Sequence, residues 1–416
     1  MRNPVLAGLL LLLLGGAALA DPRLDQLGKT AARVRGLSYR PISSQVVSQK
    51  EAADYVLRLL DAELEPRRTR TREEFLRSAG LMAQGDSLRG ILKKLYASQV
   101  RGLYDPGKKR YIVVRGAESQ PAEAAVAALG LNATDLFAVH ELGHAIQDQH
   151  FDLGGVDKKV RENFDRAVAA QTLIEGDANV VMMDYAMAQL GLDSSALDLS
   201  GSGMGIDFEP FMEYDPNLAS APPFFRDYLT FPYSQGMSFV AALRGQGGWK
   251  KVDGAFRSLP ASTEEVLHPD KYLKKNDPPK PVKLTLAKQI GKYQALGEDT
   301  AGEFTISAWE KQFIPERTYR GSSGWGGDRY RVYVSGDHAF VVWSTLWDTP
   351  RDASEFEGMA TAILKQLKTS KPQKQGHRLF FSRGSRVTIL ARKAARVDLV
   401  LDLPATMAGQ VTPVLP

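Results

Sequence analysis

The chain has 416 residues, of which 44% are hydrophobic and 24% are charged, and its formal net charge is +5. This composition is typical of globular proteins. It excludes a chain that is disordered throughout, a collagen-like repeat and a bundle of membrane helices. The small positive charge, spread over a length sufficient for about two or three domains, favours a solvated surface over a nucleic-acid partner. The chain has no cysteine, which excludes disulfides and thiol chemistry.

The first 20 residues have the pattern of a secretory signal peptide. Arg2 gives a positive start, residues 5–14 form a short apolar run, and Ala-Leu-Ala at 18–20 is a cleavage motif. The run is short for a membrane anchor, and no later stretch reaches the roughly 18 consecutive apolar residues of a membrane helix. We therefore expect a secreted or periplasmic bacterial protein without stable membrane insertion and without a lipid anchor on cysteine.

Residues 21–98 are predicted to form an N-terminal helical region with no part in the chemistry. A third helix of this region is expected over about residues 88–96. The dense basic run at 67–72 has no interleaved aromatic residues, and we expect it to be a loop between helices. Two capping boxes mark the starts of the first two helices. These boxes are Ser48 with Glu51, and Thr71 with Glu74.

A β-hairpin is predicted over residues 99–115. Strand-like residues at about 100–104 and 111–114 flank the turn sequence Asp-Pro-Gly at 105–107. The free edge of such a sheet can bind an extended peptide by strand addition. A hairpin that only covers the core is the alternative.

Residues 139–153 contain the pattern His-Glu-x-x-His. Because residues four apart share one face of a helix, His140 and His144 can bind one metal ion, with Glu141 beside it. This pattern is typical of zinc hydrolases, in which the glutamate takes a proton from a zinc-activated water. We therefore predict a Zn²⁺ site with Glu141 as the general base.

A catalytic zinc needs three protein ligands and an open position, and two residues compete for the third place. His150 lies six residues after His144. To reach the ion it needs a sharp bend of the kind that glycine allows, whereas Gln147 favours a continuous helix. Glu175 lies in the next helical segment, expected over residues 157–190 as one long helix or two in line, which can return antiparallel to the first. We expect Glu175 to be the third ligand and keep His150 as the alternative.

Two polar residues near Glu175 are candidates for orienting a ligand histidine. Asn179 shares the face of Glu175 and can accept the outer N–H of a histidine, and Asp177 is a nearby carboxylate. The small residues of this segment, between 167 and 179, are expected to let a partner helix approach closely.

Two residues further along the chain are candidate donors to the oxyanion of a hydrolytic reaction, namely Tyr233 and His268. The structural alternatives are a packed Pro-Tyr turn for Tyr233 and a helix cap for His268. Between the motifs, residues 191–222 are rich in Gly, Ser, Asp and Pro and are expected to form a loop or lid. Helical patterning resumes over residues 224–244.

The C-terminal part of the chain is predicted to be a mixed α/β module. Residues 274–281, Lys-Lys-Asn-Asp-Pro-Pro-Lys-Pro, are the best linker. Trp325, Trp343 and Trp347 are expected in its core, with ligand binding as the alternative. His338 and His377 are expected to be surface or core residues without chemistry. The predicted strands cover 329–334, 339–346, 379–381, 387–391 and 397–401, and the predicted helix covers 352–367.

Two runs of the chain resemble secreted bacterial zinc metallopeptidases of the gluzincin type. These runs are 140–151, His-Glu-Leu-Gly-His-Ala-Ile-Gln-Asp-Gln-His-Phe, and 173–178, Leu-Ile-Glu-Gly-Asp-Ala. Two later runs, 231–236 and 268–272, are similar to exported proteins with the same zinc motif. Thermolysin-like gluzincins have Asp four residues after the ligand glutamate, where this chain has Asn179. This departure points to weaker metal binding or activity.

The resemblance implies an α+β, zincin-like fold whose catalytic domain is mostly helical, with a β-hairpin or small sheet. The predicted organisation is a signal peptide (1–20), the helical region (21–98), a metallopeptidase core (99–273), a linker (274–283) and the C-terminal module (284–416). The predicted function is zinc-dependent hydrolysis of peptide bonds in a peptide or protein substrate. A catalytically weak or inactive zincin-fold envelope protein that only binds is the alternative.

Overall fold

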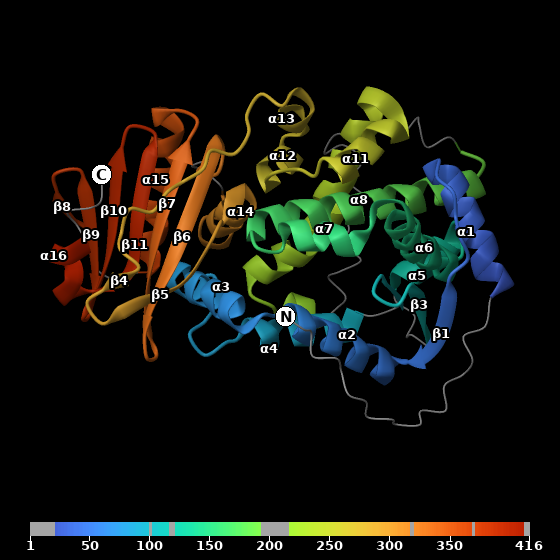
Figure 1. The fold of residues 1–416 in the computed structure, drawn as a ribbon, viewed down its shortest axis with the longest axis horizontal. Coiled ribbons are helices and arrows are strands. Elements are labelled where there is room, and N and C mark those ends of the chain that lie inside the picture. The colour runs from blue at the N-terminus through green and yellow to red at the C-terminus, as the bar shows by residue number, and fades with distance from the viewer. Residues whose placement is uncertain are drawn as a thin grey trace, which may run out of the picture.

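The computed structural model describes residues 21–99, 102–115, 121–192, 216–316, 320–367 and 371–411. The predicted signal peptide and most of the expected loop at 191–222 lie outside these ranges. Figure 1 shows a mixed α+β molecule with a large sheet at one end and, over the rest of its length, helices together with a small sheet. The large sheet has eight strands and the small one three. Within the described ranges, no helix combines the length and apolar character that crossing a membrane requires.

The N-terminal region is helical, as predicted, apart from one short strand. The capping box of Ser48 and Glu51 is confirmed, since each side chain accepts a hydrogen bond from the backbone of the other. The second predicted box is wrong, because Thr71 lies inside a helix that begins five residues earlier. The elements are α1 (Pro22–Arg35), β1 (Ser43–Ser48), α2 (Gln49–Glu63), α3 (Pro66–Ala79) and α4 (Leu88–Gln99).

The basic run at 67–72 belongs to α3, so its prediction as a loop is wrong. Glu65 caps the helix, since its side chain accepts hydrogen bonds from the backbone amides of Arg67 and Arg68. Pro66, which has no N–H group, fits the first turn. The arginines reach across to the C-terminal sheet instead of facing solvent alone. Arg70 donates to the carbonyl of Gly336 at 2.9 Å, and Arg72 pairs with Asp299 at 2.9 Å. The run therefore fixes α3 to the sheet.

The predicted hairpin is confirmed as β2 (Gly102–Asp105) and β3 (Arg110–Arg115), which pair antiparallel. The strand β1, which was not predicted, pairs parallel with β3. The order of this small sheet is β1-β3-β2, so β2 is an edge strand.

The centre of the molecule is a layer of long helices around α6 and α8. Asn132 caps α6 by accepting a hydrogen bond from the amide of Asp135 at 3.2 Å. The elements are α5 (Pro121–Ala128), α6 (Ala133–Phe151), α7 (Leu153–Val160), α8 (Phe164–Gln189), α10 (Pro216–Ala219), α11 (Pro223–Arg257), α12 (Thr263–Leu267) and α13 (Pro269–Lys274).

Small residues bring α6, α8 and α11 into backbone contact. A methyl group at Gly143 of α6 would lie 3.4 Å from the Cα atom of Ala178 in α8. The contact between α8 and α11 is closer, because a methyl group at Gly236 would lie 2.8 Å from the Cα atom of Gly176. The predicted close approach of a partner helix is therefore confirmed, with one partner on each side of α8.

The C-terminal part forms an antiparallel sheet in the order β4-β5-β6-β7-β11-β10-β9-β8. The five predicted strands and the predicted helix are confirmed, whereas β5 and α14 were not predicted. The elements are β4 (Gln289–Ile290), β5 (Tyr293–Asp299), α14 (Gly302–Phe313), β6 (Trp325–Ser335), β7 (His338–Trp347), α15 (Pro350–Leu367), β8 (Gln373–Gln375), β9 (Arg378–Arg383), β10 (Arg386–Lys393), β11 (Arg396–Pro404), η3 (Ala405–Met407) and α16 (Ala408–Val411).

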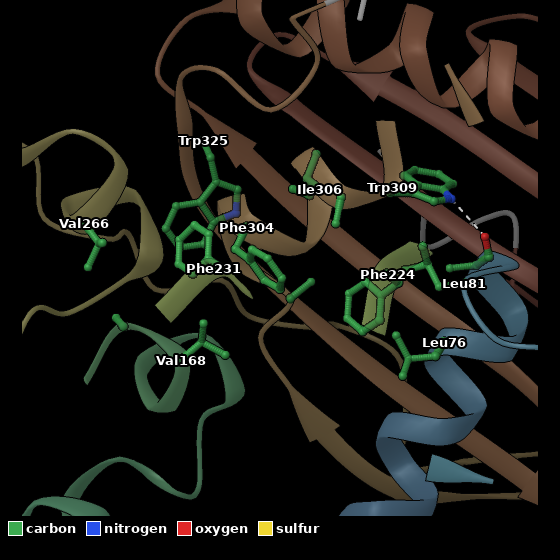
Figure 2. Close-up of a cluster of buried hydrophobic side chains, with 14 of the residues drawn as sticks. Leu76, Leu81, Val168, Phe224, Phe231, Val266, Phe304, Ile306, Trp309 and Trp325 are labelled. Carbon is green, nitrogen blue, oxygen red and sulfur yellow. Dashed lines mark hydrogen bonds between the residues drawn. The ribbon is translucent and has the colours of Figure 1, made fainter. Parts of the chain in front are cut away.

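One hydrophobic core joins the helices to the sheet. Figure 2 shows Val168 and Phe231 of the helical layer close to Phe304 of α14, and Trp309 donating a hydrogen bond toward α3. The three tryptophans at 325, 343 and 347 are buried, so their predicted role in core packing is confirmed. Asp328 links two of them by accepting hydrogen bonds from the indoles of Trp325 and Trp343, and it also accepts from two amides at the start of α14.

Candidate metal centre

The structure brings together the three residues predicted to hold a metal ion. His140 and His144 lie one turn apart on α6, with their Nε2 atoms 3.1 Å apart. Glu175 comes from α8, and its Oε2 atom lies 3.3 Å from Nε2 of His140 and 3.5 Å from Nε2 of His144. The three ligand atoms therefore form a nearly equilateral triangle.

This triangle has the size that a zinc ion requires. Ligand atoms about 2.0–2.1 Å from a tetrahedral zinc lie about 3.3–3.4 Å from one another. The observed separations of 3.1, 3.3 and 3.5 Å bracket that range. In addition, Oε2 of Glu175 is buried and lacks a well-formed hydrogen bond. A cation bound between the three residues would satisfy this acceptor.

The packing of α6 on α8 accounts for the position of Glu175. Gly143 lies between the two histidines in sequence, and it contacts Ala178, one turn after Glu175. The other carboxylate oxygen of Glu175 accepts a hydrogen bond from Gln171 at 2.6 Å, which leaves Oε2 directed at the histidines.

The electrostatics of the cluster favour a positive charge between its members. Burial opposes the charged form of His144, but the Glu175 carboxylate outweighs burial and raises the pKa of His144 to about 9. Burial likewise opposes the charged form of Glu175, but His144 and His140 together outweigh burial, so the pKa of Glu175 lies well below its ordinary value. The carboxylate is therefore ionised and ready to bind a cation.

Glu141, the predicted general base, lies on the same helix beside the cluster. Its Oε2 atom accepts a hydrogen bond of 2.6 Å from the backbone amide of Tyr104 in β2. Burial raises the pKa of Glu141, with the two histidines opposing the shift. The edge strand thus holds the carboxylate in place, and burial moves its basicity toward that of a base active near neutral pH.

Tyr233 of α11 also lies beside the cluster. Its ring stacks on that of His140, with the ring centroids 6.3 Å apart and the planes at 25°. The charge of Glu175, followed by burial, raises the pKa of Tyr233 well above its ordinary value. Its hydroxyl therefore stays protonated and can act as a donor.

The structure does not bring His268, the other candidate donor, to the cluster. It lies between α12 and α13, where its Nε2 atom is 3.0 Å from Oε1 of Glu303 in α14. A hydrogen bond with Glu303 raises the pKa of His268. This arrangement fits a residue that links α14 to the helical layer.

The alternative third ligand, His150, lies apart from the cluster. Because α6 continues through Gln147 to Phe151, His150 emerges near the end of the helix, where it is exposed. Its Nε2 atom lies 2.8 Å from the carbonyl oxygen of Ser38.

Gln147, which was predicted only to continue the helix, contacts the candidate ligand His144 directly. Its Oε1 atom lies 2.9 Å from Nδ1 of His144. Asn179, predicted for this role, is buried, but its amide nitrogen has no hydrogen-bond partner. Asp177 lies one step further out, bound to Gln147 at 2.9 Å. The three-residue spacing could have indicated this contact, because it places Gln147 one turn after His144 on the same face of the helix.

A second acidic cluster, formed by Glu264, Asp277 and Asp348, already contains a cation. The ammonium group of Lys271 lies 2.5, 2.5 and 3.2 Å from these three carboxylates. The cluster is therefore a salt-bridge network around a lysine.

Comparison with known protein families matches the C-terminal part of the chain. A family model described as a domain of unknown function (DUF8575) matches residues 288–403, which form most of the C-terminal sheet and include none of the metal-site candidates. No curated protein and no solved structure was found to match the chain.

Proposed function

We propose that this protein is a zinc-dependent metallopeptidase of the gluzincin type, with His140, His144 and Glu175 as zinc ligands and Glu141 as the general base. The observation that carries the proposal is the triangle of ligand atoms, with sides of 3.1–3.5 Å, formed by residues from two helices. A zincin-like fold belongs to the same proposal. It is supported by the histidine-bearing α6, the glutamate-bearing α8 beside it and the hairpin edge next to Glu141.

The residues around the site have complementary roles in peptide hydrolysis. Zinc, when bound, would polarise the scissile carbonyl and acidify the attacking water. Glu141 would accept the proton of that water and deliver it to the leaving amine. The hydroxyl of Tyr233 would donate a hydrogen bond to the developing oxyanion. An extended peptide or protein substrate would lie along the edge strand β2.

The proposal includes export of the protein from the cytoplasm, which rests only on the signal-peptide pattern of residues 1–20. The alternative is a catalytically weak or inactive envelope protein that keeps the zincin fold for binding. Two features motivate it: the large C-terminal region that carries no motif, and Asn179 in place of the aspartate of thermolysin-like gluzincins. Cleavage of a generic protein substrate by the wild type, abolished by a chelator, would exclude this alternative.

Removal of the third ligand is expected to abolish zinc binding at micromolar concentrations. The variant Glu175→Ala should bind zinc more than about 100-fold more weakly than the wild type, because even residues behind the ligands contribute about 10–100-fold. Zinc affinity is measured by competition with a chromophoric chelator. His150→Ala is the matched control and should retain wild-type affinity. A wild type that binds no zinc, or the reverse order of the two variants, would contradict the ligand assignment.

Zinc binding is also expected to release a proton. With the pKa of His144 at about 9 in the metal-free protein, its ring is protonated at neutral pH, and zinc must displace that proton. Zinc affinity should therefore rise with pH, by about tenfold per pH unit between about pH 6 and 8. Calorimetry in two buffers of different ionisation enthalpy measures the proton released. An affinity that is flat over this range would refute the expectation.

A further inference from the structure

A buried chain of polar side chains extends from His144 away from the metal site. Gln147 is 1% exposed, and its amide nitrogen donates to the carbonyl oxygen of Ile174 at 2.9 Å and to Oδ2 of Asp177 at 2.9 Å. Its amide oxygen faces Nδ1 of His144 at 2.9 Å. Each polar atom of this amide therefore has a partner inside the protein.

These partners determine which way the amide of Gln147 points. A carbonyl and a carboxylate can only accept hydrogen bonds, so the NH₂ group must face Ile174 and Asp177. The amide oxygen then faces His144 and accepts a hydrogen bond from Nδ1–H. With one proton held on Nδ1, Nε2 is the nitrogen that can give up its proton and offer its lone pair to a metal ion placed between Glu175 and His140.

Asp177 is in turn held by an arginine from the N-terminal helix. Nε of Arg35 lies 2.6 Å from Oδ1 of Asp177, and both side chains are 1% exposed. Arg35 also reaches Asp253 at 2.8 Å and lies 4.3 Å from the ring centroid of Trp249, both in α11. A buried carboxylate without this arginine would be strongly disfavoured.

We propose that Gln147 is the positioning residue of His144, and that the buried pair of Asp177 and Arg35 fixes the direction of its amide. Helix α1, which ends at Arg35, would then contribute to metal affinity although it supplies no ligand. The inference rests on the proposed zinc site.

Zinc affinity of the purified full chain tests the proposal. Gln147→Met keeps the length of the side chain and removes its hydrogen bonds, and we expect its zinc Kd to rise by about 10–100-fold. Gln149→Met is the matched control on the same helix. The side chain of Gln149 exchanges hydrogen bonds with the backbone of Arg40, away from the metal site, so its Kd should stay at the wild-type value. An unchanged Kd for Gln147→Met overturns the proposal. A wild type that binds no zinc overturns the proposed function itself.

A rescue experiment separates positioning from packing. Gln147→Glu places a second carboxylate against Asp177, and we expect it to weaken zinc binding. The double variant Gln147→Glu/Asp177→Asn exchanges the positions of the amide and the carboxylate. The carboxylate at 147 can then accept from Nδ1–H of His144, and the amide at 177 can donate to that carboxylate. Zinc affinity of the double variant should exceed that of Gln147→Glu but stay below that of the wild type, because a glutamate at 147 offers no N–H to the carbonyl oxygen of Ile174. An absence of rescue, with both variants folded by circular dichroism, would refute positioning by this pair.

Discussion

Glu141→Gln is expected to lower kcat/KM for peptide cleavage by about 10²–10⁴-fold while zinc remains bound. The glutamine keeps the shape of the side chain and can still accept the hydrogen bond from the amide of Tyr104. It cannot take a proton from water. Because Glu141 is not one of the three ligand residues, the zinc content of the variant should equal that of the wild type.

The measurement pairs activity on a fluorogenic peptide with metal analysis of the same sample. Glu162→Gln, an exposed glutamate on the surface, is the control and should keep full activity. Full peptidase activity in Glu141→Gln would exclude Glu141 as the base. Loss of zinc together with activity would show that the carboxylate supports the metal site instead.

Gly236→Ala is expected to lower the free energy of unfolding by about 3 kcal/mol or more. The added methyl group would lie 2.8 Å from the Cα atom of Gly176 and closer still to the carbonyl oxygen of Thr172. Both contacts are with the backbone of α8, so no side-chain rotation relieves them. Separation of α8 from α11 would also move Glu175 away from Tyr233, and zinc affinity should fall with stability.

The part of α11 that follows its kink at Gly247 and Gly248 provides a control of opposite sign. Gly254 lies in α11 with nothing within 4 Å of an added methyl group. Gly254→Ala should therefore leave stability unchanged or raise it by about 0.5–1 kcal/mol through helix propensity. Denaturant unfolding of the metal-free proteins measures both effects. Equal stability of Gly236→Ala and Gly254→Ala would show that the two helices are not in backbone contact.

The cluster of His140, His144 and Glu175 could be predicted because most of the information for it is local in the sequence. The four-residue spacing of His140 and His144 places both rings on one face of a helix, and Gln147 keeps that helix straight, which removes His150. Glu175 required only one further assumption, that a second helix returns beside the first. The small residues between 167 and 179 supported it.

Other features could not be predicted because their partners are remote in sequence. The role of Gln147 depends on Asp177 and on the carbonyl of Ile174, about one helix away along the chain. The strand β1 is short, and it forms by pairing with β3 some 67 residues later, between Ser43 and Arg110. The arginines of α3 looked like a solvated loop, since nothing in the local sequence shows that a distant sheet offers carbonyl groups to them.

The shared core has a consequence for how this chain can be divided. The matched family segment, residues 288–403, contributes the sheet, yet Phe75 of α3 stacks on Tyr330 at 4.1 Å and Ala79 accepts the hydrogen bond of Trp309. A fragment with the boundaries of the family model would leave this side of the sheet bare. Helix α3 is therefore part of the core of this sheet, and a fragment that begins at residue 288 should be less stable than the same sheet in the full chain.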